Sequence, residues 1–331
     1  MSLTMAEAMA LAPLYRDLTT DEIDDLVVGL EYRRFAPGET LMIQGESSDG
    51  AYVIVSGAVA VAARLPGGGE TAIAELGPGD LLGEMALLMR GGKRTATARA
   101  RGAVEAVFTD RRYFEAALNL LRPASLKVLR QLGLTIADRL RTIRARSREL
   151  VDATAGIGLL RPPPSGEPHP PATFDVRAFL PILPCLREFT DDEIDALVLI
   201  ARVEHVLRGR VLSEAGETID APRLVVRGAL LLGQRRGGGL CQLDILGPGR
   251  FAGVAPVLEG APAGATVIAV EDSTLLAFDG NALVSLWNGQ GPISLRLLEA
   301  VNADLVLSLN TASNHLTRLT AQVRLGELTP A

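Results

Sequence analysis

Aromatic residues make up only 4% of this chain of 331 residues, which has three histidines and two cysteines. Proteins that bind single-stranded nucleic acid without sequence preference stack the bases on aromatic side chains, so this scarcity argues against that class. Cys185 and Cys241 form no CxxC pair and the histidines are far apart along the chain, so no metal site is predicted. We expect both cysteines to be small buried apolar residues in a reducing compartment.

Long apolar runs and a basic charge balance are also missing. No stretch has 18 consecutive apolar residues, so the sequence predicts no membrane-spanning helix. The start of the chain, Met1 to Ala12, lacks the basic flank of a secretory signal. A net charge of −6 opposes general binding to nucleic-acid phosphates, which requires a basic surface. These absences predict a cytoplasmic protein with no membrane partner. They also disfavour DNA as a partner.

An internal repeat is present, and the chain has the length of two domains. Apolar residues make up 48% of the sequence, which is enough for packed cores. The segment Thr20 to Asp24 recurs as Asp191 to Asp195, and the glycines that follow recur at nearly the same spacing. The matched glycines are Gly38, Gly45, Gly57, Gly77 and Gly79 in the first repeat and Gly209, Gly216, Gly228, Gly247 and Gly249 in the second. We therefore predict a first domain at residues 1–155 and a second at residues 174–331.

Residues 156–173, between the repeats, are rich in proline and glycine and include Pro162 to Pro164. Proline has no backbone N–H to donate, so we expect neither a helix nor sheet pairing in this segment. A chain rich in proline is extended and semi-rigid. The segment is therefore predicted to be a linker that spaces the two domains.

Each repeat changes from short β-rich runs to one long helical pattern. In the first repeat the predicted strands are 41–43, 51–55, 58–63, 71–76, 95–100 and 104–109. Apolar residues then recur in steps of three and four from Leu126 to Ile143, and again from Ile293 to Leu319, as in amphipathic helices. The sequence thus predicts two antiparallel sandwiches or rolls, each followed by a helix whose apolar stripe would pack on a partner helix.

The segment from Gly77 to Thr97 carries the most informative motif. Gly83 and Glu84 begin a short apolar stretch, and Arg94 follows a pair of glycines. With the upstream glycines, this segment resembles the phosphate-binding cassette of the cyclic-nucleotide-binding domain family, which includes bacterial catabolite activator proteins and protein kinase regulatory subunits. The resemblance covers residues 14–150 and, less strictly, 180–310. It implies a mainly β fold with flanking helices, in which each domain is a β-roll of the double-stranded β-helix, jelly-roll-like kind with a long C-terminal helix.

The resemblance also implies which residues bind the ligand. A cyclic phosphate carries one negative charge, and a guanidinium such as that of Arg94 can meet it with charge-assisted hydrogen bonds. In the family, the N–H groups of Ala86 and Ala96 and the Thr95 hydroxyl would face the same phosphate, and Glu84 would accept from the ribose 2′-hydroxyl. The full predicted set is Leu82, Gly83, Glu84, Met85, Ala86, Arg94, Thr95 and Ala96. The ligand is cAMP or cGMP, with a slight preference for cAMP, and no catalytic residue, metal or other cofactor is predicted.

The second repeat lacks these residue types. The aligned pairs are Glu84 with Val254, Ala86 with Pro256, Arg94 with Gly264 and Thr95 with Ala265. A pocket without the arginine, and with proline in place of a backbone donor, would leave the charge of a phosphate uncompensated. We therefore expect the second domain to be a structural or docking module.

Together these features predict a non-enzymatic sensor that binds cyclic nucleotide in its first domain and acts on a downstream protein partner. No catalytic motif supports an enzyme. One alternative is an interaction scaffold that no longer binds nucleotide. Another is a transcription regulator of the catabolite-activator type without its own DNA-binding module, because few residues follow the second long helix.

The two predicted long helices add two expectations. They are expected to pair within one chain, as a pseudo-dimer, or between two chains of a homodimer. The end of the first helix carries the only basic run of the sequence: Arg139, Arg141, Arg144, Arg146 and Arg148. We interpret this run as a solvated helix face, with contact to nucleic acid or to an acidic partner as the alternative.

Overall fold

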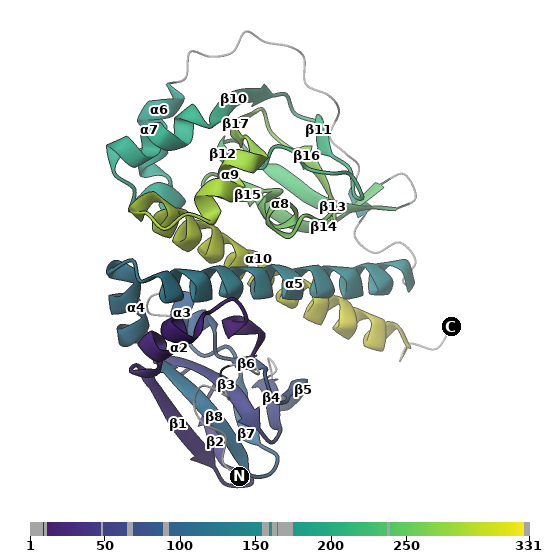
Figure 1. The fold of residues 1–331 in the computed structure, drawn as a ribbon. Coiled ribbons are helices and arrows are strands. Elements are labelled where there is room, and N and C mark those ends of the chain that lie inside the picture. The colour runs from purple at the N-terminus through teal and green to yellow at the C-terminus, as the bar shows by residue number, and fades with distance from the viewer. Residues whose placement is uncertain are drawn as a thin grey trace. The chain divides into compact units, whose positions relative to one another are not determined.

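The computed structural model of the chain describes residue 9 and residues 12–47, 49–64, 69–88, 93–153, 159–160, 164, 175–236 and 239–327 (Figure 1). The chain divides into two compact units, residues 1–132 and 133–331. This division falls inside a long helix, upstream of the predicted linker 156–173, most of which lies outside the described residues. Each unit contains one β-roll, and the mainly β fold with flanking helices predicted from the sequence is confirmed.

The first unit opens with a 3-10 turn (Pro13–Tyr15) and helix α2 (Thr20–Val27). The helix begins at Thr20 because Thr19 and Glu22 form a capping box. The backbone N–H of Thr19 donates to Glu22 Oε2 at 2.8 Å, and that of Glu22 donates to Thr19 Oγ1 at 3.3 Å. The second unit repeats this start, since Thr190 and Glu193 form the same box before helix α7 (Asp191–Leu199).

The first roll consists of two four-stranded antiparallel sheets. One sheet has the order β1 (Leu30–Phe35), β8 (Val104–Asp110), β3 (Gly50–Ser56) and β6 (Leu81–Leu82). The other has the order β2 (Thr40–Met42), β7 (Thr97–Ala100), β4 (Val59–Arg64) and β5 (Glu70–Leu76). The core lies between their inner faces and includes Ile54, Val59, Ala98 and Ala106, all fully buried.

Strand β1 was not among the predicted strands, although the other long strands were. Its sequence, from Leu30 to Phe35, contains one glutamate and two arginines, which are poor strand formers. It forms because it pairs with β8 along its whole length, from Leu30 opposite Thr109 to Phe35 opposite Val104. Pairing with a distant strand therefore overrides a weak local preference.

The first roll has one helix between its strands β6 and β7 and two helices after its last strand. Helix α3 (Met85–Leu88) is a single turn, and helix α4 (Arg111–Asn119) starts where the N–H of Tyr113 donates to Asp110 Oδ1 at 3.0 Å. Helix α5 (Pro123–Ala153) is long, and proline at its first position suits a helix start. Its predicted stripe is largely buried: Leu126, Leu129, Leu132, Ile136 and Leu140 are at most 2% exposed.

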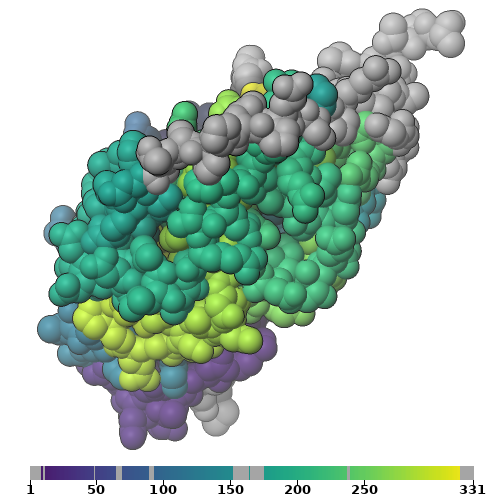
Figure 2. Space-filling model, turned by 90° about the horizontal axis from the view of Figure 1, so that it is seen from above, coloured from purple at the N-terminus to yellow at the C-terminus, as the bar shows by residue number. Residues whose placement is uncertain are grey.

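The second roll has the same strand order with one strand added. Its first sheet is β10 (Ala201–Val206), β17 (Ser273–Phe278), β12 (Arg223–Arg227) and β15 (Phe251–Ala252). Its second sheet is β11 (Val211–Ser213), β16 (Thr266–Ala269), β13 (Leu230–Arg236), β14 (Gly239–Leu246) and β9 (Leu159–Leu160). Its helices are α6 (Val176–Phe179), α7, α8 (Val254–Glu259), α9 (Gly280–Trp287) and α10 (Pro292–Glu327), with 3-10 turns at Leu180–Ile182 and Pro184–Leu186. The turn at Pro184–Leu186 contacts α10. In the space-filling view, teal surface from the start of this unit borders yellow-green surface from its C-terminal part (Figure 2).

The added strand β9 corrects one expectation. No sheet pairing was expected within residues 156–173, yet Leu159 and Leu160 pair with Cys241 and Leu240 of β14. Both residues precede the prolines and keep their backbone N–H groups. They add to an edge strand whose hydrogen-bonding groups would otherwise lack a strand partner on that side.

Within the second unit, the last part of α5 packs against α10 at matching positions of the two repeats. Gly133 lies ten residues after Pro123, the start of α5, and Asn302 lies ten residues after Pro292, the start of α10. A Cβ placed on Gly133 would lie 2.1 Å from Asn302 Oδ1, so the helices touch there. Further along both helices, Val151 and Leu319 belong to one buried apolar cluster. The two helices therefore run in the same direction.

Candidate functional site

The cassette predicted from the sequence forms one continuous structure in the first roll. Strand β6 pairs with β3, so that Leu82 lies opposite Tyr52. Gly83 then turns the chain with a φ of +78°, a conformation that side chains other than glycine rarely adopt, and leads into α3. On the far side of the cassette, Lys93 bridges to Ser47, and Arg94 follows it directly.

All eight predicted site residues lie in the described part of this cassette. Five are buried (Leu82, Glu84, Ala86, Arg94 and Ala96), Gly83 and Met85 are half-buried, and Thr95 is exposed. The two ends of the cassette meet, because Arg94 Nη1 lies 3.4 Å from the carbonyl oxygen of Gly83. The Arg94 guanidinium thus contacts one other predicted site residue, Gly83, directly.

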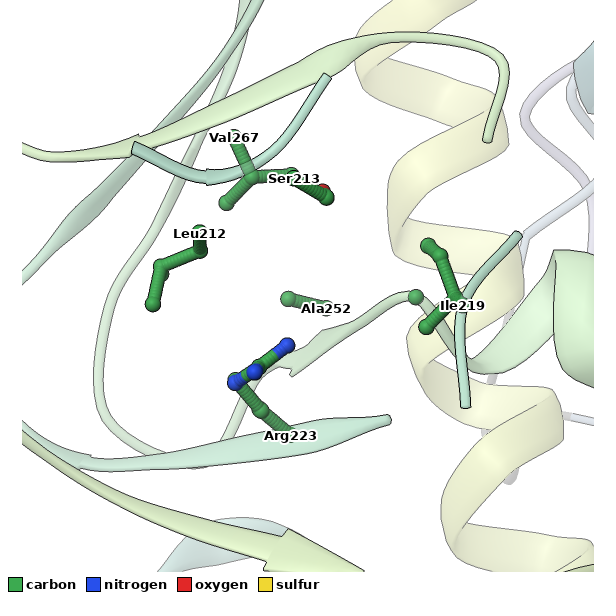
Figure 3. Close-up of a pocket in the computed structure, with 7 residues that line it drawn as sticks. Leu212, Ser213, Ile219, Arg223, Ala252 and Val267 are labelled. Atoms are coloured by element: carbon green, nitrogen blue, oxygen red, sulfur yellow. The ribbon is translucent and has the colours of Figure 1, made fainter. Parts of the chain in front are cut away.

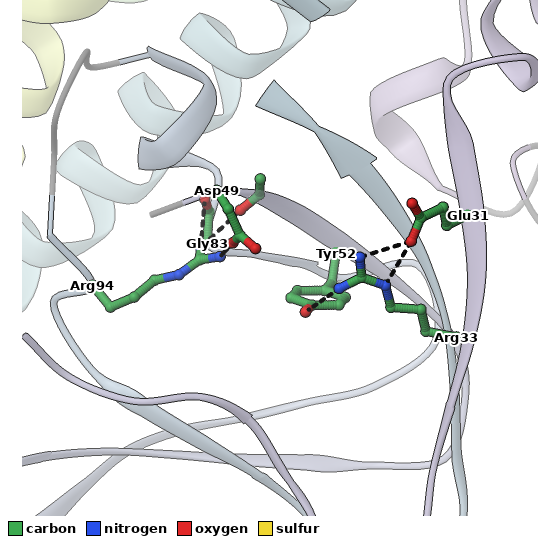
Figure 4. Close-up of polar contacts among 7 residues, drawn as sticks. Glu31, Arg33, Asp49, Tyr52, Gly83 and Arg94 are labelled. Carbon is green, nitrogen blue, oxygen red and sulfur yellow. Dashed lines mark hydrogen bonds and ion pairs between the residues drawn. The ribbon is translucent and has the colours of Figure 1, made fainter. Parts of the chain in front are cut away.

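Arg94 is a buried cation with three oxygen partners (Figure 4). Its side chain is only 5% exposed. Nη1 donates to the carbonyl oxygen of Gly50 at 2.8 Å as well as to Gly83, and Nη2 lies 2.8 Å from Asp49 Oδ1. Buried charges need such partners to offset the loss of water. The carboxylate of Asp49 is 68% exposed, so the guanidinium is paired with an anion that lies at the surface of the site.

Asp49 is a functional candidate that the sequence analysis did not assign. It lies 45 residues before Arg94, just before β3, and nothing local in the sequence links the two. A ligand phosphate would offer Arg94 the same kind of acceptor as this carboxylate. The arrangement therefore allows an exchange of one anionic partner for another at a guanidinium that is already in position.

The short helix contributes less than the resemblance implied. α3 has one turn, and the N–H of Ala86, expected to face a phosphate, donates to the carbonyl oxygen of Gly83 at 3.0 Å. The N–H of Leu87 likewise donates to the carbonyl oxygen of Glu84, at 2.9 Å. Glu84 itself is 6% exposed, directly after the Gly83 turn.

A second arginine occupies the inner face of the same sheet. Arg33 of β1 stacks over the ring of Phe108, with 3.6 Å between its guanidinium carbon and the ring centroid, and donates to Tyr52 Oη at 3.0 Å (Figure 4). Burial lowers the pKa of Arg33, but its hydrogen bonds to Glu31 and Tyr52 outweigh this effect and raise it. The sequence analysis missed Arg33 because it did not predict β1.

The second roll corrects the alignment of the two cassettes. In the first roll Gly45 donates its N–H to the carbonyl oxygen of Arg94, and in the second Gly216 donates to that of Ala263. The N–H groups of Arg94 and Ala263 also donate to matching residues, Glu46 and Glu217.

The counterpart of Arg94 is therefore Ala263, not Gly264, and the counterpart of Thr95 is Gly264, not Ala265. The second cassette is shorter than the sequence alignment assumed, and a deletion inside a loop leaves no local signal of its position. None of the residues from Gly253 to Thr266 is an arginine.

A small cavity lies beside Gly253 in the second roll, at the turn that matches Gly83 of the first (Figure 3). The cavity has a volume of about 10 Å³, room for about one water molecule. It is lined by Leu212, Ser213, Ile219, Arg223, Ala252, Gly253 and Val267. Ile219 packs against Gly253, within 3.0 Å of where a Cβ would be, whereas Arg94 Nη1 approaches the matching Gly83. An isoleucine thus takes the place of the guanidinium.

Comparison with known proteins assigns this architecture. The family described as "Cyclic nucleotide-binding domain" matches residues 32–120 and 203–289, more than half of the chain. The chain belongs to the cyclic nucleotide-binding domain family. Both matches of the family contain a roll with its cassette, so the tandem arrangement predicted from the sequence is confirmed.

Individual relatives cover parts of the chain. It is 34% identical over 107 residues to the CRP-like cAMP-activated global transcriptional regulator of Mycobacterium tuberculosis, which is 32% of this chain and 47% of that protein. It is 35% identical over 130 residues to the cyclic AMP receptor protein of Thermus thermophilus, 39% of this chain and 58% of that protein. The chain thus matches about half the length of these relatives. A structure of the regulatory domain of Toxoplasma gondii PKA with cAMP is 17% identical, with a TM-score of 0.33 and coverage of 88% of this chain and 92% of that one.

Across the described ranges, no group of three or more His, Cys, Asp or Glu side chains is placed to hold a metal ion. No helix in those ranges is both long and apolar enough to cross a membrane. Cys241 is buried as expected, but Cys185 is only half-buried, and burial raises the pKa of both thiols.

Proposed function

We propose that this protein is a non-enzymatic sensor that binds one cyclic nucleotide, cAMP by preference, in its first β-roll. The observation that carries this proposal is the buried guanidinium of Arg94, held between the carbonyl oxygens of Gly50 and Gly83 and the exposed carboxylate of Asp49. The second roll has alanine at that position. Two relatives are named as cAMP-activated or cyclic AMP receptor proteins, which favours cAMP over cGMP.

In this proposal the phosphate of the nucleotide replaces Asp49 as the anionic partner of Arg94. The carbonyl oxygens of Gly50 and Gly83 keep the guanidinium in place during the exchange, because each accepts from Nη1 while Nη2 turns to the ligand. The buried Glu84 accepts a hydrogen bond from the ribose 2′-hydroxyl, and Thr95, exposed beside Arg94, adds a hydroxyl donor. Leu82, Met85, Ala86 and Ala96 complete the wall of the site. Binding needs no metal or other cofactor.

The contact between α5 and α10 favours pairing of the long helices within one chain rather than in a homodimer. Gly133 and Asn302, at matching positions of the two repeats, already touch in a single chain. The two helices thus imitate the symmetric pair of a dimer. We propose that the response to nucleotide passes along this pair to a downstream protein partner.

Isothermal titration calorimetry with cAMP and with cGMP tests the proposal, with Arg94→Leu as the variant. One site per chain is expected, with tighter binding of cAMP. Loss of hydrogen bonds to a charged phosphate should cost about 1.5 to 3 kcal/mol, roughly ten- to a hundredfold in affinity. Two sites per chain, or unchanged affinity in a folded Arg94→Leu variant, would contradict it.

One observation favours a second candidate, a protein-interaction scaffold that no longer binds nucleotide. Arg94 already has three oxygen partners, and the N–H of Ala86 is bonded to Gly83. A site satisfied by its own chain can exist without ligand. The same titration separates the two candidates, because a scaffold gives no heat with either nucleotide.

A further inference from the structure

The basic run near the end of α5 contacts the degenerate cassette of the second roll, inside the second unit. Arg148 donates from Nη2 to the carbonyl oxygen of Gly264 at 2.9 Å and from Nε to Gln234 Oε1 at 3.1 Å. Arg141 Nε lies 4.0 Å from the carboxylate of Glu259, the last residue of α8. Two arginines thus contact the second cassette on both sides of the loop between α8 and β16. The interpretation of this run as a solvated face was wrong for Arg148, which is half-buried.

A buried ion cluster lies next to this contact. Arg250 pairs with Asp304 and, at 3.2 Å, with Asp244, and it donates to Ser308 Oγ at 2.9 Å. Asp244 and Asp304 are 7% and 5% exposed. Burial lowers the pKa of Arg144 on α5 to about 10, while both carboxylates oppose this effect. Arg144 therefore lies within electrostatic reach of the cluster and stays charged at neutral pH.

Apolar and backbone contacts extend the docking surface to the end of α5. Val151 shares a buried cluster with Cys241 of β14 and Leu319 of α10. Arg236, at the end of β13, donates from Nη1 to the carbonyl oxygen of Val151. Beyond the helix, β9 adds to β14. The second roll therefore holds α5 and the chain after it through polar, charged and apolar contacts.

These docking groups have no equivalents in the first roll. The first-roll position that matches Asp244 is Ala74, and the one that matches Arg250 is Asp80, both exposed. Strand β5 is mostly exposed, whereas its counterpart β14 is mostly buried. The charged cluster is therefore specific to the second repeat.

We propose that the second roll is an intramolecular docking module for α5, whose degenerate cassette binds guanidinium groups of that helix at Gly264 and Glu259, and that this docking sets the nucleotide affinity of the first roll. The inference rests on the proposed function. α5 is one continuous helix that belongs to the first unit up to Leu132. There Val128 lines an apolar cavity with Leu81 and Leu87 of the first cassette. Docking of residues 133–151 keeps this wall of the cassette in place, and a preorganised site binds more tightly.

Removal of the docking arginines tests the proposal in the full chain. The variant is Arg141→Ala with Arg148→Ala, the two arginines that contact the second cassette, and the control is Arg146→Ala, an exposed arginine of the same helix. Hydrogen exchange by mass spectrometry should show faster exchange over residues 133–151 in the double variant only. The Kd for cAMP should rise about fivefold or more, a typical coupling between two sites, with no change in the control. By reciprocity, cAMP should slow exchange in the same helix of the unaltered chain.

A milder variant, on the second roll instead of α5, keeps the test informative if the arginine variants misfold. Gln234→Ala removes one acceptor of Arg148 without a change of charge, and it should shift exchange and Kd in the same direction by a smaller factor. Faster exchange in α5 with an unchanged or lower Kd would overturn the coupling, and unchanged exchange would overturn the docking. If the unaltered chain gives no heat with cAMP, the proposed function fails, and with it the coupling, while the exchange data still decide whether these arginines dock α5.

Discussion

The two cassettes share a backbone and differ in chemistry. Gly83 and Gly253 turn the chain with the same φ of +78°, yet the nearest group to the first is the guanidinium of Arg94 and the nearest to the second is Ile219. The glycine framework therefore belongs to the fold, because it persists where the anion partner is gone. Ligand binding must be argued from side chains and not from the turns that carry them.

The inner faces of the two rolls differ in the same way. In the first roll Arg33 of β1 bonds to Tyr52 of β3, and at the matching positions of the second roll Glu204 pairs with Arg223, with 2.7 Å between Oε2 and Nε. Burial raises the pKa of Glu204, but its bonds to Arg223 and Arg202 outweigh this and lower it. Both rolls thus have a polar pair at these two positions, but the residues of the pair carry different charges. The Arg223–Glu204 pair of the second roll is thus satisfied within the chain.

The largest effect is expected when the two matching glycines, Gly83 and Gly253, are each replaced by alanine. Gly83→Ala and Gly253→Ala both put a side chain at positive φ, which costs about 1 to 2 kcal/mol of stability. Only at Gly83 would the new Cβ lie 2.2 Å from Arg94 Nη1, so only this variant should lose cAMP affinity, by about tenfold or more. Calorimetry and thermal unfolding of both variants check this. Equal affinities would mean that the position of Arg94 does not matter for the ligand.

The next comparison concerns the contact between α5 and α10. At matching positions, α5 has the small residue Gly133 and α10 has the larger residue Asn302. Gly133→Leu should destabilise the second unit by about 1 to 3 kcal/mol, because the side chain would overlap Asn302 and Trp287. Asn302→Ala in the same chain should recover part of that loss. Thermal unfolding of the single and double variants measures the coupling, and simple additivity would argue against the contact.

Glu84 is a further difference between the two rolls. Val254 occupies its position in the second roll, which therefore has no carboxylate there to accept a hydrogen bond from a ribose hydroxyl. Glu84→Gln should weaken cAMP by about tenfold through loss of a charged acceptor for the 2′-hydroxyl. Binding of 2′-deoxy-cAMP should change much less, since that ligand lacks the donor. A competition assay with both nucleotides tests the assignment, and an equal loss for both would assign Glu84 a structural role.

The smallest expected effect concerns the ion pair of Arg235 with Glu214 in the second roll. The first roll has Ile43 at the position of Glu214. Arg235 donates to Glu214 at 2.8 Å and so lowers the pKa of that carboxyl, against the opposing effect of burial. A lowered folded pKa stabilises the protein above the unfolded value of about 4.3, and this contribution is lost as pH falls through the folded pKa. Glu214→Gln should lower stability at pH 7 by less than about 1 kcal/mol and have no effect in strong acid. Thermal unfolding from pH 7 to pH 3 measures the difference, which should shrink as the pH falls.

Much of the architecture could be predicted from the chain itself. Repeated capping residues such as Thr19 and Thr190, and glycines with positive φ such as Gly38 and Gly209, mark the ends and turns of elements in both repeats. The amphipathic stripes located both long helices. Two features were not predicted. One is strand β1, whose charged sequence forms a strand only against β8, and the other is the pairing of Leu159 and Leu160 with β14.

The candidate site could be predicted in part. The segment from Leu82 to Ala96 was located, but Asp49 and Arg33 were missed, because each reaches the site from a strand or turn far away in sequence. The counterpart of Arg94 in the second repeat was misplaced by one residue. Only the hydrogen bonds of Gly45 and Gly216 to the strand opposite revealed that it is Ala263.

The sequence by itself determined the turns, the caps and the two-fold repetition, because each depends on groups a few residues apart. The tertiary structure decided the partners of the charged side chains. Arg94 pairs with Asp49, 45 residues away, and Arg148 meets Gly264, 116 residues away. Such pairings depend on which strands become neighbours and on which surfaces lose water, and those properties exist only once the chain has folded.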